Sequence, residues 1–203
     1  MRRYAIAGLA AGAAMMIGGA LAAVSGNAPS PTNPTAADAG VMNPMIAGQA
    51  MLASRTILDN ISASPDHTAL VAAMRDSGVA GVLKASAQFT VFAPTNAAMA
   101  AVPAQDKARL ARQMGYLVVP GKYDSQALLK AIALGGGQAK LRTVEGGVLI
   151  ARLNGPANII LVDANGGTAN VTVYDVYDRN GVMHVVDHML EPGSGSARQV
   201  ASN

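Results

Sequence analysis

Apolar positions in the first half of the chain recur at the three- and four-residue spacing of helices. In residues 56–61 and again in residues 65–77, the apolar side chains fall on one face. Pro65 favours a helix start, and Gly78 favours a helix end. These signals predict a set of helices that also includes the following segments: 79–83, a helix from Ala97, 106–114 and 125–134.

The second half of the chain changes to β-branched runs separated by glycine and asparagine. These runs predict strands at 148–153, 159–162, 171–176 and 182–190. An earlier short strand is expected at 89–93, where Pro94 ends it by lacking an N–H group. Helices followed by mostly antiparallel strands predict an α+β fold.

The first 22 residues have the pattern of a secretory signal peptide. Arg2 and Arg3 form a basic start, a long uncharged apolar run follows, and Ala20-Leu21-Ala22 offers small residues for cleavage before Ala23. An uncleaved membrane anchor is the alternative, because the run is about long enough to span a bilayer. We expect cleavage, and no membrane insertion afterwards.

Composition narrows the range of partners. Leaving out Arg2 and Arg3 lowers the formal net charge from +3 to +1, so charge gives no reason to expect nucleic acid or anionic membranes as partners. The chain has no cysteine, which excludes disulfides, thiol chemistry and a lipid anchor on an N-terminal cysteine. Stability is therefore expected to come from a packed apolar core.

The mature chain divides into three parts by composition. Residues 23–42 are rich in proline, serine, asparagine and threonine and predict an extended tether. Residues 43–192 are expected to form one folded domain without internal repeats. Residues 193–203 begin with Gly-Ser-Gly-Ser and predict a disordered tail.

Three segments carry a family resemblance: 89–99 (FTVFAPTNAAM), 116–123 (YLVVPGKY) and 180–190 (NGVMHVVDHML). Together they resemble the signature segments of a fasciclin-like (FAS1) domain. The resemblance implies a β-sandwich or wedge with helices packed on one side, and a scaffold used for adhesion and interaction rather than for a reaction. The residues expected to build this motif are Phe89, Phe92, Pro94, Thr95, Asn96, Gly181, His184 and Asp187.

His184 admits three interpretations: a catalytic base, a metal ligand with His188, or a structural histidine. Both faces of the segment 182–190 are apolar at the centre, as in a central strand covered on both sides. On a strand, the Cα atoms of His184 and His188 lie about 13 Å apart, too far to share one zinc ion easily. The family resemblance implies that His184 is buried and hydrogen-bonded, and we favour the structural role.

Tyr116-Leu117 departs from the family pattern, which carries a tyrosine–histidine pair there that is associated with adhesion in animal relatives. Leucine cannot form a hydrogen bond through its side chain. We therefore do not expect this chain to bind in full as the tyrosine–histidine pair of the animal relatives does. Tyr116 and Tyr123 are either amphipathic residues at the edge of the core or binding anchors. The candidate binding residues are Tyr116, Val118, Tyr123, Asp175, Tyr177 and Asn180.

The residue patterns give little support to an enzyme. The chain lacks a Gly-x-Ser-x-Gly motif, a phosphate-binding glycine loop and a zinc-binding motif, and we expect no cofactor and no metal. The favoured hypothesis is an exported adhesion or interaction module that binds an envelope or matrix protein or a polysaccharide, in the periplasm or outside the cell. Two alternatives stay open: a carrier of a small apolar ligand between helices and sheet, and a structural component that self-associates.

Overall fold

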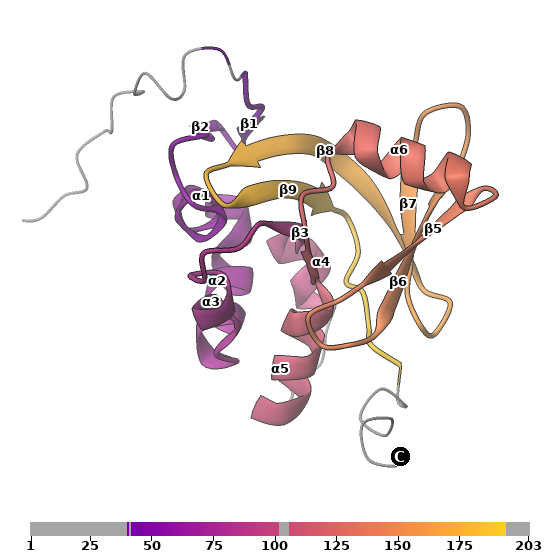
Figure 1. Ribbon diagram of the computed structural model, residues 1–203. Coiled ribbons are helices and arrows are strands. Elements are labelled where there is room, and N and C mark those ends of the chain that lie inside the picture. Colours follow the sequence, from indigo (N-terminus) through magenta and orange to yellow (C-terminus); the bar gives the residue numbers. More distant parts are fainter. Residues whose placement is uncertain (1–39, 41, 102–105, 194–203) are drawn as a thin grey trace, which may run out of the picture. The chain divides into compact units, whose positions relative to one another are not determined.

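A computed structural model describes residues 40, 42–101 and 106–193 of the chain (Figure 1). The predicted signal peptide 1–22, nearly all of the predicted tether 23–42 and the predicted tail beyond Gly193 lie outside the described residues. None of the described helices is long and apolar enough to cross a membrane.

Side chains cap the starts of α1, α4, α5 and α6. Thr56 and Asp59 form a reciprocal capping box at the first helix, and Asp106 and Asp124 each accept a hydrogen bond from the first turn of a later helix. The predicted helix 65–77 is split into a 3-10 turn and an α-helix. The bounds are α1 Ile57–Ala63, η1 Pro65–His67, α2 Thr68–Asp76, α3 Val79–Val82, α4 Asn96–Ala100, α5 Lys107–Tyr116 and α6 Ser125–Leu134.

The strands form a two-stranded hairpin and a seven-stranded sheet of order β4-β3-β9-β8-β7-β6-β5. Neighbouring strands run antiparallel except β3 and β9, which are parallel. The α+β prediction is therefore confirmed. The bounds are β1 Met45–Ile46, β2 Gln49–Ala50, β3 Phe89–Pro94, β4 Val118–Pro120, β5 Gln138–Arg142, β6 Val148–Leu153, β7 Ile159–Val162, β8 Thr168–Asp178 and β9 Gly181–Val186.

Strand β8 joins the two halves of the sheet and bends between them. Its pairing with β9 shifts register twice between Val171 and Val176, and Asp175 has a left-handed backbone with φ of 57°. The far end of the sheet then returns toward β4, since the amide of Val144 donates to the carbonyl oxygen of Val118 at 2.8 Å. The expected sandwich or wedge is built in this way, from one strongly curved sheet.

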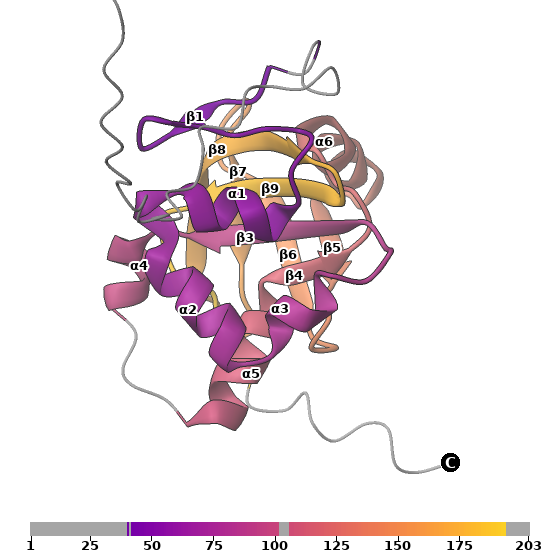
Figure 2. The ribbon, with the colours of Figure 1, turned by 90° about the vertical axis from the view of Figure 1, so that its left-hand side faces the viewer.

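The helices α1 to α5 gather beside β3, β4 and β9, while α6 packs over β5 and β6 (Figures 1 and 2). All six residues of β9 are buried, as expected for a central strand covered on both faces. The strand ends at Val186, four residues earlier than predicted, because the Asp187 carboxylate accepts hydrogen bonds from the backbone and side chain of Asn170. At the other end, Gly181 is required because a Cβ there would lie 1.8 Å from the carbonyl oxygen of Phe89.

Candidate interaction surface

A buried histidine connects β9 to the loop between β4 and α6. His184 has no exposed area, and its Nδ1 accepts a hydrogen bond from the amide of Asp175 at 3.2 Å. Nε2 therefore carries the hydrogen and donates it to the carbonyl oxygen of Tyr123 at 2.8 Å. The ring stacks on Phe92, with centroids 5.7 Å apart. Burial lowers the pKa of His184, so the imidazole is neutral near pH 7.

Asp175 continues this connection from β8 to the start of α6. Its carboxylate accepts hydrogen bonds from the amide of Ser125 at 2.7 Å and from the Ser125 hydroxyl. A carboxylate at a helix N-terminus satisfies a free backbone N–H group and interacts favourably with the helix dipole. The left-handed backbone of Asp175 thus serves both partners, His184 through its amide and Ser125 through its side chain.

Thr90 of β3 holds the same loop from the other side. Its hydroxyl oxygen accepts from the amide of Tyr123 and donates to the carbonyl oxygen of Gly121, both at 2.8 Å. Residues 121–125 are consequently tied to β3, β8 and β9 together. We call residues 121–124 the 121–124 loop.

The 121–124 loop presents a cation and an aromatic ring beside a second aromatic ring. The exposed Lys122 places its Nζ 4.7 Å from the centre of the partly exposed Tyr177 ring, a cation–π contact worth about 0.5–1 kcal/mol. Both backbone polar groups of Tyr177 pair with the side chain of Asn43. Tyr123, also partly exposed, lines a surface pocket of about 410 Å³ together with residues of α6 and β5. Lys122, Tyr123 and Tyr177 are hereafter the loop surface.

Two of the predicted binding residues lie inside the protein. Tyr116 and Val118 have no exposed area, and the Tyr116 hydroxyl donates to the carbonyl oxygen of Val148 at 2.8 Å. Burial, with Asp163 and Glu145 nearby, raises the pKa of Tyr116 to about 12. A partner cannot touch either side chain in this fold, so the proposal of direct binding by these two residues is corrected to a role in the core.

Asn180 has a structural task at the turn between β8 and β9. Its side-chain oxygen accepts from the amide of Ile57 at 2.9 Å, and its side-chain nitrogen donates to the carbonyl oxygen of Leu83 at 2.8 Å. It thereby fastens the turn to α1 and to the end of α3. Both polar atoms of the Asn180 side chain are thus used within the protein itself.

The remaining motif residues form the corner between β3 and α4. Phe89, Phe92 and Pro94 are buried in β3, and the Thr95 hydroxyl caps α4. Asn96 accepts from the amide of Ala69 at 3.0 Å and donates to the carbonyl oxygen of Pro65 at 2.9 Å, so it links α4 to η1 and α2.

Sequence reasoning missed Lys122, Thr90 and Ser125. Lys122 lies within the quoted segment 116–123, and its neighbour Tyr123 was the available signal. Thr90 and Ser125 carried no recognisable signal, because their partners are 33 and 50 positions away in the chain. Within the part of the chain that the structure describes, no group of three or more histidine and carboxylate side chains is placed to hold a metal ion.

Comparison with known proteins identifies the class. The family model of the Fasciclin domain matches residues 65–192, so the chain belongs to the fasciclin-domain family. It is 30% identical over 148 residues to Protein sll1483 of Synechocystis sp., covering 68% of this chain and 73% of that protein. It is 34% identical over 149 residues to periostin of Homo sapiens, covering 71% of this chain but only 16% of periostin.

The solved structure of a FAS1 domain pair from the insect cell adhesion molecule fasciclin I has a similar fold. The match has a TM-score of 0.54 at 18% identity and covers 67% of this chain and 50% of that one. At this identity the likeness concerns the fold. Fasciclin-domain proteins are typically adhesion or interaction modules and not enzymes.

Proposed function

We propose that this protein is an exported, non-enzymatic adhesion or interaction module that acts at the cell envelope or in the extracellular matrix. The loop surface is the observation that carries the proposal. Lys122, Tyr123 and Tyr177 combine ring faces, a cation and partial exposure, the features that concentrate binding energy at protein interfaces.

The network beneath the loop surface favours binding because it holds the loop in one conformation. His184, Asp175 and Thr90 together make five hydrogen bonds to residues 121–125. A partner that docks on a preorganised loop loses less conformational entropy than one that must order it. The buried histidine thus supports the surface indirectly, without touching a partner.

The proposed partner is an envelope or matrix protein or a polysaccharide, with a second copy of this chain as a further possibility. Tyrosine rings offer flat apolar faces with a polar tip, which suit both peptide and sugar surfaces. The single lysine and the low net charge of the chain favour contact by shape and apolar area over attraction between opposite charges.

A carrier of a small apolar ligand has less support. Flexible methionine side chains suit an adaptable apolar groove, but Met74, Met114 and Met183 are each completely buried in the packed core. The pockets found among the described residues lie at the surface and are lined by polar as well as apolar side chains. A preformed apolar cavity is what a carrier would need.

The proposed function predicts saturable binding of the purified protein to intact cells and isolated envelopes of its own source. The double variant Tyr123→Ala, Tyr177→Ala is expected to bind at least about tenfold more weakly, because it removes both rings of the loop surface. Affinity would be measured by a sedimentation binding assay with labelled protein, and the fold of each variant by circular dichroism.

The matched control removes two exposed aliphatic side chains elsewhere, Val82→Ala with Leu153→Ala, which are 37% and 39% exposed. It is expected to bind like the wild type. Undiminished binding by a folded double tyrosine variant would show that the binding site lies outside the loop surface. Absence of saturable binding by the wild type would overturn the adhesion proposal.

Export predicts a processed N-terminus. Intact-mass spectrometry of the protein recovered from its source is expected to show a chain that begins at Ala23, consistent with small residues at the cleavage site. A mass that includes residues 1–22 in a membrane fraction would instead support the anchor alternative.

A further inference from the structure

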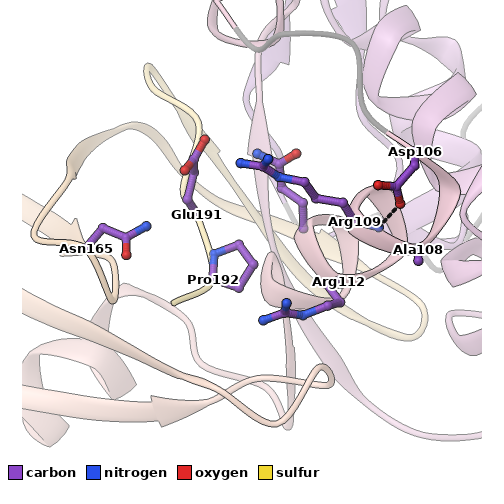
Figure 3. A pocket seen from close by; sticks show the side chains of 8 residues that line it. Asp106, Ala108, Arg109, Arg112, Asn165, Glu191 and Pro192 are labelled. Carbon is purple, nitrogen blue, oxygen red and sulfur yellow. Dashed lines mark hydrogen bonds between the residues drawn. The ribbon is translucent and has the colours of Figure 1, made fainter. Parts of the chain in front are cut away.

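A second pocket lies between α5 and the C-terminal segment of the domain (Figure 3). Its volume is about 480 Å³, within the size range of small-molecule sites. None of its residues belongs to the loop surface. Its polar lining consists of Asp106, Arg109, Arg112, Gln113, Asn165 and Glu191.

Two of the lining side chains are already engaged in the fold. The Asp106 carboxylate caps α5 by accepting from the amide of Arg109 at 2.9 Å. Arg112 donates from Nε to Glu145 at 3.1 Å and from a terminal nitrogen to the carbonyl oxygen of Gly193 at 2.8 Å. These bonds hold the C-terminal segment against α5 and give the pocket fixed walls.

Two other side chains have unused hydrogen-bonding capacity. Arg109 extends from α5 toward the segment that carries Glu191 and Pro192, and its guanidinium makes no ion pair or hydrogen bond with the residues that the structure describes (Figure 3). Gln113 is only 2% exposed, and its Oε1 has no hydrogen-bond partner. A buried carbonyl oxygen without a donor is unfavourable, so a ligand that supplies a donor to it is stabilised.

We propose that this pocket binds a hydroxylated carboxylate of the uronic acid type, as the free sugar acid or as a residue of an acidic polysaccharide. The planar Arg109 guanidinium pairs with the carboxylate. Gln113 lines the same pocket, and a ligand hydroxyl that reaches its Oε1 donates a hydrogen bond there. Asn165 and Glu191 receive further hydroxyl groups from the opposite wall.

The charged groups that line the pocket favour a sugar acid over a neutral sugar, a phosphate or an acidic peptide. A neutral sugar leaves the Arg109 guanidinium unpaired, and a doubly charged phosphate faces the carboxylates of Asp106 and Glu191. A sugar acid offers one negative charge surrounded by hydroxyl donors, which matches one free cation among several acceptors. An acidic peptide offers the charge but few donors next to it.

The test is isothermal titration of the full purified chain with glucuronate, galacturonate and an oligogalacturonate. Glucose and a short glutamate-containing peptide are run beside them. Saturable binding of the sugar acids and at least tenfold weaker binding of glucose and the peptide are expected. Tighter binding of the oligomer than of the free acids would identify a polysaccharide as the source, and equal or weaker binding would identify the free acid.

Arg109→Gln is expected to weaken sugar-acid binding at least tenfold, because it replaces the positively charged guanidinium group by a neutral amide. Arg75→Gln removes another exposed helical arginine, which does not line the pocket, and is expected to bind like the wild type. Three outcomes would overturn the proposal: no binding of any sugar acid, undiminished binding by the Arg109 variant, and tighter binding of the peptide. This test is independent of binding at the loop surface.

Discussion

Replacing His184 by alanine is expected to lower the free energy of unfolding by about 3–5 kcal/mol. The change removes a completely buried ring that stacks on Phe92, and it leaves the carbonyl oxygen of Tyr123 and the amide of Asp175 without their partner. Urea unfolding followed by circular dichroism measures the loss. Binding through the loop surface is expected to weaken as well, because the 121–124 loop loses one of its anchors.

His188→Ala is the matched control. It changes the same residue type four positions along the chain, where the side chain is 69% exposed and pairs with Asp187 at 2.8 Å. An exposed side-chain contact of this kind contributes less than about 1 kcal/mol, so this variant is expected to unfold nearly as the wild type does. A His184 variant as stable as the His188 variant would show that the buried network contributes little to the fold.

The second large effect concerns Asp178, whose variant Asp178→Asn is expected to remove a pH dependence of stability. Asp178 is buried at the end of β8, where its Oδ1 accepts from Asn60 at 2.5 Å and its Oδ2 has no partner. Burial raises the pKa of this carboxyl group from 3.8 to about 8, although the hydrogen bond from Asn60 opposes the shift.

The direction of the pH effect follows from the sign of that shift. The folded protein holds the Asp178 proton up to about pH 8, whereas the unfolded chain releases it near pH 4. The stabilising contribution of this group is therefore complete below pH 4 and is lost as the pH rises to about 8. The loss is about 1.4 kcal/mol per pH unit within this window, on the order of 5 kcal/mol in total.

Asparagine has no such proton and preserves the side-chain oxygen that Asn60 contacts. The variant is expected to match the wild type near pH 4 and to be more stable by several kcal/mol at pH 8.5, measured by urea unfolding across the range. Asp76→Asn, at an exposed position of α2, is the control and is expected to follow the wild type at every pH. A constant difference between Asp178→Asn and the wild type would contradict the shifted pKa.

The hydrogen bonds of Asp178 are also expected to affect the binding of a partner to the loop surface. Asn60 links Asp178 to the backbone of Leu52 through both its oxygen and its nitrogen, and Asp178 directly follows Tyr177 in β8. Loss of the proton at alkaline pH is expected to loosen this end of β8. Weaker binding through Tyr177 above pH 8, with binding kept in the Asp178→Asn variant, would connect the two.

Local signals predicted most of the regular elements. The caps Asp106 and Asp124 and the periodic apolar residues place α5 and α6 within a few positions of their predicted bounds. The short strands β1, β2 and β4 were not predicted. Strand β5 was also missed, although its residues alternate between exposed and buried. That pattern was available in Gln138–Arg142, but its polar residues have low strand propensity and obscured it.

The binding residues were less predictable, because aromatic character does not say which way a side chain faces. Tyr116 and Tyr123 lie in the same quoted segment, yet Tyr116 is buried at the end of α5 while Tyr123 is partly exposed in the 121–124 loop. The difference depends on Val148, which accepts the Tyr116 hydrogen bond from a strand 32 positions away.

By itself the sequence determined the family, the α+β class, the capped helices and the central apolar strand, because each depends on short-range spacing of residue types. Three contacts became visible only in the tertiary structure. Lys122 lies over the Tyr177 ring, Asp175 binds Ser125, and Arg109 of α5 lines the same pocket as Glu191. These contacts join positions 50 or more residues apart. They depend on how the curved sheet and the helices pack, and no local pattern of polar and apolar residues encodes that packing.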